Sequence, residues 1–457
     1  MTTNPQDLQD VFDFIEENQD EYIAWLQLLC RQPSVAAQNR GMQEAAALVQ
    51  QLTEAIGART ELVPTSGFPV VYGEIDSGER RTLSFYNHYD VQPEDPLEEW
   101  DRDPFSAEIA EGRIWARGVA DNKGNLIARL AAVHAYQQVR GRLPLNVKFI
   151  FEGEEEIGSP NLHEFVASHP DKVQADACLW EAGYKDVNNR IQVALGVKGM
   201  LYVHLSVEAA NTDIHSAYAA IVPSAAWRLV QALNTLKDQD ERVLIPGFYD
   251  TVADPDEAEK KLLDSMPFDE TGFLKGLDIP AFVRGATGNE VKERLIFQPT
   301  CNICGITTGY QGPGSKTVLP AKASAKLDFR LVPDQNPDEI LKLLRSHLDE
   351  QGFQDVNIER GHGSMPAKTD VHDPIVKTVL DGVPRIYGHE AVVHRMTPGT
   401  GPMYILCQSQ GIPSVQVGVG HHASQNHAPN ENIYVEDFVS GIKMIAHILD
   451  EFPRQVV

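Results

Sequence analysis

Two hydrophobic periods alternate along the first part of the chain. Short apolar runs predict β-strands at residues 70–75, 83–87, 146–151 and 177–180. Apolar residues that recur at helical spacing predict helices at residues 7–30, 43–56 and 124–139. This alternation is typical of an α/β fold, in which helices cover both faces of a mostly parallel sheet.

The pattern changes near Gly196 and returns near residue 374. Between these points the sequence predicts strands at 201–207, 300–308 and 323–332, helices at 223–236 and 337–348, and an acidic insert at 250–270. After them it predicts a helix at 374–387, a strand at 415–419 and a final helix at 435–452.

This order of elements predicts two domains. A chain of 457 residues is longer than one hydrophobic core usually supports. We therefore predict a main α/β domain formed by residues 1–196 and 374–457, interrupted by an inserted α+β domain of residues 197–373.

The charge balance excludes some classes of partner. The chain has 39 Lys and Arg against 65 Asp and Glu, a formal net charge of −26. Nucleic acids and anionic membranes bind basic faces, so neither is an expected partner. No apolar stretch approaches the roughly 20 residues that span a bilayer, and the polar, acidic start of the chain does not resemble a secretory signal.

The cysteines favour a reducing compartment. Five cysteines, sparse and odd in number, do not suit a disulfide framework, and we expect a cytoplasmic protein. Cys301 and Cys304 have the spacing of half a zinc site or of a redox pair. Because no second pair exists and their segment reads as a strand, we predict buried, reduced cysteines.

Residues that can bind metal ions follow the predicted strands. His88 follows the strand at 83–87, and Asp90 points to the same side, where it could accept the second ring N–H of a metal-bound histidine. A structural His–Asp pair is the alternative. Asp121 lies in a glycine-flanked loop before a helix, where a carboxylate caps the helix or bridges two cations.

Further acidic residues and a histidine follow the later predicted strands. Four acids at positions 152–156 repel one another, and such a cluster normally persists with cations nearby; an exposed acidic turn is the alternative. Glu181 follows the strand at 177–180, and His427 comes after the strand at 415–419. His421 and His422 are possible ligands that lack a matching acidic context.

Together these motifs resemble a known family. They are His88-Tyr89-Asp90, Asp121-Asn122-Lys123-Gly124, Glu155-Glu156-x-Gly158-Ser159, Glu181 and His427-x-x-Asn430-Glu431. In this order they resemble the co-catalytic zinc exopeptidases, which include carnosine and cytosolic dipeptidases, aminoacylases, succinyl-diaminopimelate desuccinylase and glutamate carboxypeptidase. The resemblance covers essentially the whole chain and is greatest to the carnosine-dipeptidase branch, through Ile214-His215-Ser216 and residues 314–320 and 328–333.

The resemblance implies a catalytic main domain that binds two divalent ions. One ion would be held by His88, Asp121 and Glu181, and the other by Asp121, Glu156 and His427. The peptide between Asp121 and Asn122 would be cis. Ligands of this type favour Zn²⁺, with Mn²⁺ or Co²⁺ as alternatives. Two such ions share and activate a water molecule.

The resemblance also assigns catalytic roles. Glu155 would be the general base and Asp90 would orient His88. In this family the histidine of a motif like that around His215 reaches into the partner subunit's site and stabilises the oxyanion. The inserted domain is therefore expected to be a lid and dimerisation domain, and the protein a homodimer. A plain loop histidine is the alternative.

The expected substrate carries a free carboxylate. Arg330 resembles the residue that grips this group with two parallel hydrogen bonds. Thr317 and the loop residues Gly399, Thr400 and Gly401 are expected to join it, although glycines between prolines also make a plain turn.

The predicted function is that of a dinuclear metallopeptidase that cleaves dipeptides or other short peptides. Glu181 departs from the pattern of the dipeptidases, which often carry aspartate here, while carboxypeptidases and acylases more often carry glutamate. An N-acyl-amino-acid amidohydrolase or a carboxypeptidase is therefore the alternative. An inactive metal-binding scaffold is a remote one, because Glu155 is present.

Overall fold

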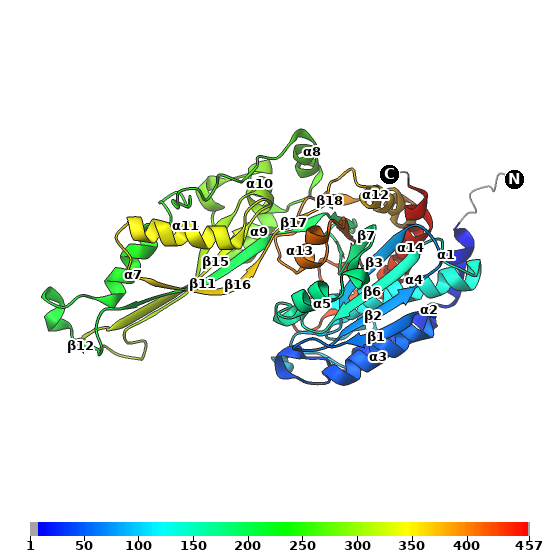
Figure 1. The fold of residues 1–457 in the computed structure, drawn as a ribbon, viewed down its shortest axis with the longest axis horizontal. Helices are drawn as coiled ribbons and strands as arrows, with labels where there is room; N and C mark the ends of the chain where they lie inside the picture. The colour runs from blue at the N-terminus through cyan, green and yellow to red at the C-terminus, as the bar shows by residue number, and fades with distance from the viewer. Residues whose placement is uncertain (1–7, 456–457) are drawn as a thin grey trace.

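The structure, a computed structural model, describes residues 8–455, and its largest element is an eight-stranded sheet (Figure 1). In spatial order its strands are β1 (Arg59–Val63), β2 (Val70–Ile75), β6 (Asn146–Glu152), β3 (Thr82–His88), β7 (Ala177–Trp180), β19 (Ser414–Gln416), β9 (Gln192–Ala194) and β18 (Val392–His394). The central strands β6, β3, β7 and β19 run parallel. The antiparallel pairs lie toward the two edges of the sheet.

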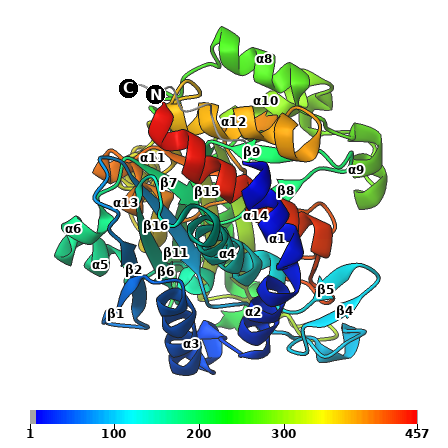
Figure 2. The ribbon, with the colours of Figure 1, turned by 90° about the vertical axis from the view of Figure 1, so that its right-hand side faces the viewer.

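Helices cover both faces of this sheet, as the sequence predicts. Phe85, Phe149 and Leu179 point to one face and belong to the core formed with α1 (Gln9–Glu17), α2 (Gln19–Arg31), α3 (Met42–Ala55), α4 (Gly124–Arg140), α12 (Pro374–Tyr387) and α14 (Val435–Glu451). Figure 2 shows α4 and α14 side by side across this face. Tyr86 and Trp180 point to the other face, toward the short helices α5 (Leu162–Ser168), α6 (Pro170–Val173) and α13 (Met403–Leu406).

The inserted segment forms a second, antiparallel sheet. Its strands, in spatial order, are β13 (Thr300–Thr308), β15 (Lys322–Leu331), β11 (Gly199–Glu208) and β16 (Asn357–Ser364). Buried and less buried residues alternate along β11, because one face of the sheet packs on α7 (Ala225–Asn234) and α11 (Pro337–Glu350). The acidic insert at 250–270 contains α8 (Glu257–Ser265), and α9 (Glu270–Leu277) and α10 (Asn289–Phe297) follow it.

The remaining strands are short. β12 (Ile214–His215) pairs with β14 (Val318–Leu319), and β10 (Gly196–Val197) pairs with β17 (Ala367–Lys368) where the chain passes between the two large sheets. Near the main sheet, β21 (Asn432–Tyr434), β5 (Arg113–Trp115) and β4 (Glu108–Ala110) form a small sheet, and β20 (Gly420–His421) pairs with β8 (Tyr184–Lys185). The domain boundaries given above remain a prediction.

Two predicted elements differ from the structure. The helix predicted at 7–30 is two helices separated at Asn18, whose side chain donates to the Phe14 carbonyl at 2.8 Å; residue 7 lies outside the described residues. The strand predicted at 415–419 is shorter, because β19 ends at Gln416. Within residues 8–455, no helix is both long and apolar enough to cross a membrane.

The prediction that Cys301 and Cys304 are both buried is wrong for Cys304. Cys301 is buried, but Cys304 is exposed and its thiol lies 3.1 Å from Oδ1 of Asp328. The strand register shifts between Ile303 and Gly305, at the second cysteine. All five cysteines are free thiols in the structure.

Candidate metal centre

Candidate ligands gather at one edge of the main sheet. The parallel neighbours β3, β6 and β7 end beside one another: His88 is the last residue of β3, and the chain continues from β6 to Glu156 and from β7 to Glu181. The carboxyl ends of parallel strands share one edge, where open α/β sheets bind ligands. A cleft of about 1170 Å³ opens there, lined from the main sheet side by Asp121, Glu155, Glu156, Glu181 and His427.

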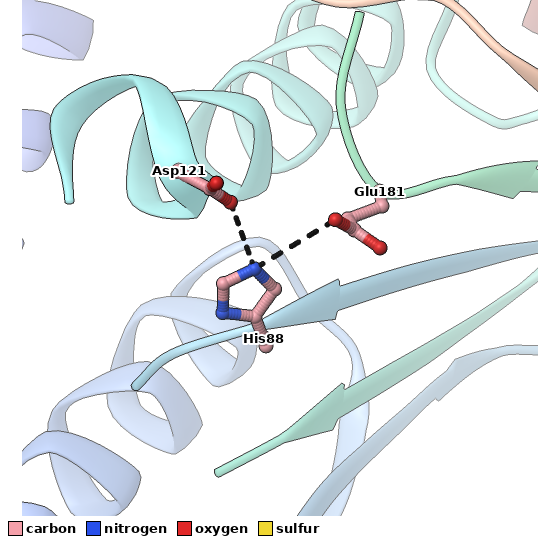
Figure 3. Close-up of side chains that lie close together, drawn as sticks. All are labelled: His88, Asp121 and Glu181. Atoms are coloured by element: carbon pink, nitrogen blue, oxygen red, sulfur yellow. Dashed lines mark hydrogen bonds and ion pairs between the residues drawn. The ribbon is translucent and has the colours of Figure 1, made fainter. Parts of the chain in front are cut away.

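The first group consists of His88, Asp121 and Glu181. One potential ligand atom from each lies within 4.8 Å of the others. His88 Nε2 is 3.1 Å from Asp121 Oδ1 and 4.0 Å from Glu181 Oε1. Figure 3 shows the imidazole at the end of its strand, with both carboxylates directed toward it. Three different elements therefore supply one potential coordination shell.

The second group shares Asp121 and adds Glu156 and His427. Its potential ligand atoms also lie within 4.8 Å of one another. His427 Nε2 is 3.4 Å from Asp121 Oδ2 and 3.1 Å from Glu156 Oε2. Asp121 thus presents one carboxylate oxygen to each group, which is the geometry of a bridging ligand.

The local backbone around Asp121 decides between the two interpretations of this residue. Helix α4 begins at Gly124 with no side-chain cap, so the helix-capping interpretation of Asp121 is wrong. The peptide between Asp121 and Asn122 is cis, as the family resemblance predicts. Glu181 and His427 adopt positive φ angles of 27° and 58°, a conformation that is uncommon outside glycine and clusters at functional sites.

The alternative of an exposed acidic turn is also wrong. Glu152 and Glu154 are buried, and Glu155 and Glu156 are half-buried. Burial, followed by the charge of Glu181, raises the pKa of Glu155 well above its usual value. Burial likewise raises the pKa of Glu181 to about 7. Buried acids in this number indicate a site built for cations.

Neighbouring carboxylates raise the pKa of both histidines, His88 and His427. Hydrogen bonds to Asp121 and Glu156 raise the pKa of His427 to about 10. Burial opposes the charged form of His88, but Asp121 and Asp90 outweigh it and raise the pKa. Burial alone would raise the pKa of Asp121, yet the two histidines hold it below its usual value. Imidazole and carboxylate ligands without a thiolate fit Zn²⁺ and similar divalent ions.

Asp90 contacts both His88 and the turn that carries the acids. Its Oδ1 lies 3.4 Å from His88 Nδ1, and its backbone carbonyl lies 3.1 Å from the same nitrogen. Its carboxylate also accepts the backbone N–H groups of Glu155 and Glu156, at 3.3 and 3.0 Å. One aspartate therefore holds the histidine and the acidic turn in fixed relation.

Three neighbours of the cluster were not predicted from the sequence. Asn426 donates to Asp121 Oδ2 at 3.1 Å, and Gln92 donates to Glu156 Oε2 at 2.9 Å. Arg129 is buried in α4 and donates to the Glu181 carbonyl at 2.7 Å. In the sequence, Arg129 could have been noticed as a charged residue on the almost wholly apolar face of its helix.

Arg330 faces the cluster from the inserted domain. Its Nη1 donates to Thr400 Oγ1 at 3.0 Å, and both residues line the cleft. A methyl group added at Gly401 would lie 3.8 Å from Glu155 Oε1 and 3.9 Å from Glu181 Oε2. Gly399 precedes these residues in the same loop, and its carbonyl accepts the backbone N–H of Lys198. The glycine loop therefore lies between Arg330 and the acids.

His215 and Thr317 lie outside the cleft that contains the candidate ligands. Thr317 Oγ1 is 3.5 Å from His215 Nε2, and neither residue lines the cleft. Strand β12, which carries His215, is at the end of the inserted domain farthest from the main sheet (Figure 1). The structure thus groups Thr317 with His215, and within one chain it does not bring Thr317 to Arg330.

His421 and His422 belong to neither potential shell. His421 is buried against Asn432, with Nε2 at 3.0 Å from its side-chain oxygen. Burial lowers the pKa of His421 to about 4, so this imidazole is neutral at ordinary pH. His421 is therefore a core histidine.

Comparison with known proteins agrees with this arrangement. The model of peptidase family M20/M25/M40 matches residues 84–451. A β-Ala-His dipeptidase from Mus musculus is 27% identical over 98% of this chain and 96% of that protein. The Cys-Gly metallodipeptidase dug1 from Schizosaccharomyces pombe is 25% identical over 97% of this chain and 98% of that protein.

A solved structure is also similar over nearly the whole length. The M20 family metallo-carboxypeptidase Sso-CP2 from Sulfolobus solfataricus superposes with a TM-score of 0.90 at 39% identity. The superposition covers 95% of this chain and 100% of that chain. The arrangement of the two sheets is therefore shared with a metallopeptidase.

Proposed function

The chain belongs to peptidase family M20/M25/M40 and is a metallopeptidase, and from this premise we propose that it hydrolyses dipeptides and other short peptides with a free C-terminal carboxylate. One observation carries this proposal. Two potential metal shells share Asp121, and Glu155 lies in the same cleft without belonging to either shell. A protein that only stores metal ions would not need a carboxylate beside them that binds neither ion.

The proposed ligands divide between two ions. His88, Asp121 and Glu181 hold one, and Asp121, Glu156 and His427 hold the other. Zn²⁺ suits this donor set best, with Mn²⁺ or Co²⁺ as alternatives because carboxylates outnumber imidazoles. When bound, two such ions lower the pKa of a shared water and polarise the scissile carbonyl.

Glu155 is the proposed general base. Its raised pKa, caused by burial and by Glu181, suits a group that takes a proton from water and later gives it to the leaving amine. Asp90 holds the backbone of Glu155 and the ring of His88 together. A group that transfers protons in this way contributes about 10²–10⁴-fold in rate.

Arg330 and the glycine loop are the proposed site for the substrate's carboxylate. A guanidinium binds a carboxylate through two parallel N–H bonds, and Thr400 already orients this one. Because Arg330 lies on the inserted domain and Glu155 on the main domain, a bound peptide would contact both. This arrangement favours cleavage next to a free C-terminus.

We place His215 and Thr317 in the active site of a partner subunit. Both residues are exposed at the end of the inserted domain, away from the cleft of their own chain. An imidazole directed at the oxyanion that forms during hydrolysis is worth about 2.7–4 kcal/mol of barrier. This role makes the protein an obligate homodimer for catalysis.

A carboxypeptidase that accepts longer peptides is the second candidate. Two observations favour it: the similarity to the metallo-carboxypeptidase Sso-CP2 and the presence of glutamate at position 181. An N-acyl-amino-acid amidohydrolase would use the same carboxylate site.

Release of amine from a panel of substrates tests these alternatives. The metal-reconstituted protein is incubated with dipeptides, tripeptides, N-acetylated dipeptides and N-acyl amino acids of the same C-terminal residue. A dipeptidase releases amine fastest from the dipeptide, whereas a carboxypeptidase also cleaves the tripeptide and the N-acetylated dipeptide. No release from any of the peptides would refute peptidase activity.

A further inference from the structure

We propose that Glu431 is a positioning residue that holds the shared ligand Asp121 in place and joins its loop to the loop of His427. The inference rests on the metal roles proposed above. Its consequence is that tight metal binding depends on a carboxylate that touches no metal. Removal of this carboxylate therefore weakens metal binding even in protein that remains folded.

Four donors converge on this one buried side chain. Oε1 accepts the backbone N–H groups of Ala120 and Asp121, at 2.9 and 3.0 Å. Oε2 accepts the backbone N–H of Gly118 at 2.8 Å and Nη1 of Arg117 at 2.9 Å. Glu431 is only 1% exposed, so water cannot replace these contacts.

The loop needs such an acceptor because its backbone is irregular. Residues Val119–Lys123 form a π-type turn in which Asp121 departs from helical angles, with φ −127° and ψ 84°. The N–H of Asp121 itself is one of the four donors. Buried N–H groups outside regular structure require a partner, and here one carboxylate supplies it for the backbone of Gly118, Ala120 and Asp121 and for one side chain.

Glu431 also joins two loops that are distant in the sequence. It lies four positions after His427 and about 310 positions after Asp121, whose N–H it accepts. Its own carbonyl accepts the N–H of Ala116, and Asn432 continues into β21, which pairs with β5. The bridging ligand and a ligand of the second ion are therefore fixed to each other through Glu431.

Arg117 depends on the same carboxylate. It is 1% exposed, and within residues 8–455 its Nε and Nη2 atoms have no hydrogen-bond acceptor. The ring of Trp100 covers the guanidinium, with 5.1 Å between Cζ and the ring centroid. Removal of one partner from a buried charge pair leaves the other uncompensated, which is strongly destabilising.

The substitution Glu431→Gln changes the hydrogen bonds of this side chain but not its size. Glutamine has the same size, but its amide offers one acceptor oxygen and one NH₂ group. Two N–H donors point at each oxygen of Glu431. In either orientation of the amide, the NH₂ group therefore faces two donors and cannot accept their hydrogen bonds. The variant therefore keeps the packing and loses two of the four hydrogen bonds that Glu431 accepts.

The matched control is Asp450→Asn in α14. Asp450 is a buried carboxylate that accepts Tyr136 Oη at 2.6 Å and pairs with Arg454 at 2.7 Å. It lies 15 positions beyond the start of α14, or roughly 22 Å along the helix. This variant also loses a buried charge, but at a distance from the proposed metal ligands.

The experiment measures Zn²⁺ affinity by chelator competition, and thermal unfolding of the metal-free proteins. We expect Glu431→Gln to bind Zn²⁺ about 10–100-fold more weakly than the natural protein, the range seen for groups that orient ligands. Asp450→Asn should bind it within twofold of the natural value. We expect both metal-free variants to unfold at a lower temperature than the natural protein, by similar amounts.

A Zn²⁺ affinity of Glu431→Gln within threefold of the natural value would overturn the proposal and leave Glu431 a structural residue. If Glu431→Gln fails to fold, Glu431→Asp takes its place under the same thresholds, because it retains both oxygens on a shorter side chain. Neither measurement uses a peptide. Failure of the proposed peptidase activity would therefore be seen separately, as tight metal binding without amine release.

Discussion

Nε2 of His88 lies 3.1 Å from Oδ1 of Asp121, although 33 positions separate these residues in the sequence. His88 ends a central strand, and Asp121 stands in the turn before α4. Asp121 directs its other oxygen toward His427, at 3.4 Å. A single carboxylate is thus the point at which both potential metal shells meet.

Glu155→Gln should retain both metal ions and lose turnover. Glutamine has the size of glutamate but cannot take a proton, and Glu155 belongs to neither potential shell. We expect kcat to fall by about 10²–10⁴-fold, the contribution typical of a general base. Metal content by elemental analysis and kcat from amine release check this, with Glu156→Gln as the variant that should lose metal. Loss of metal in Glu155→Gln would contradict the assigned role.

Arg330→Lys should weaken the binding of peptides with a free C-terminus. Lysine keeps the charge but cannot form two parallel bonds to a carboxylate. The loss of a charge-assisted bond, about 1.5–3 kcal/mol, predicts a rise in KM of roughly 10–150-fold. Arg360→Lys is the matched control, because Arg360 also lines the cleft from the inserted domain and pairs with Asp338, as Arg330 pairs with Asp328, whereas Arg330 also donates to Thr400 of the glycine loop. Equal effects of the two substitutions on KM would contradict a special role for Arg330.

His215→Ala and Arg330→Ala should complement each other. Each variant alone is expected to be inactive, but a mixed dimer has one site with both residues intact if His215 acts on the partner. Equal mixing followed by subunit exchange should restore about a quarter of the natural activity, because half of the dimers are mixed and each has one intact site. A second sample, in which labelled subunits show that exchange has occurred, serves as the control. A fully active monomer would refute the trans role.

Metal binding should release protons and strengthen as the pH rises. His427 has a raised pKa of about 10 in the metal-free protein because it bonds to Asp121 and Glu156, whereas a ligating histidine is neutral. Between pH 7 and 9 the ion therefore displaces at least one proton, and affinity should rise about tenfold per pH unit for each proton. The ion pairs of His427 stabilise the metal-free protein fully below pH 6.5, and this contribution is lost as the pH rises through about 10.

Calorimetric titration of the metal-free protein in two buffers with different ionisation enthalpies counts the released protons. His421→Gln is the matched control, since burial lowers the pKa of His421 to about 4 and this histidine carries no proton to release. The variant should release as many protons as the natural protein. A Zn²⁺ affinity that is independent of pH between 7 and 9 would contradict the prediction.

The sequence by itself determined the central strands of the main sheet, three of the four strands of the second sheet, the longer helices and the chemistry at the strand ends. Apolar runs such as Val70–Ile75 specify strands because both faces of the main sheet are covered. The ordered motifs around His88, Asp121 and Glu155 resemble those of the co-catalytic zinc exopeptidases, and this resemblance identified a candidate dinuclear site near the ends of the strands, where open α/β sheets bind ligands.

Only the tertiary structure decided which of these residues meet. It excluded His421 by burying it against Asn432, and it grouped Thr317 with His215 at the far end of the inserted domain. It also revealed that Glu431 accepts the N–H of Asp121. Sequence periodicity describes neighbours within one element, whereas these contacts join residues that are far apart in the chain and depend on how the separate elements pack.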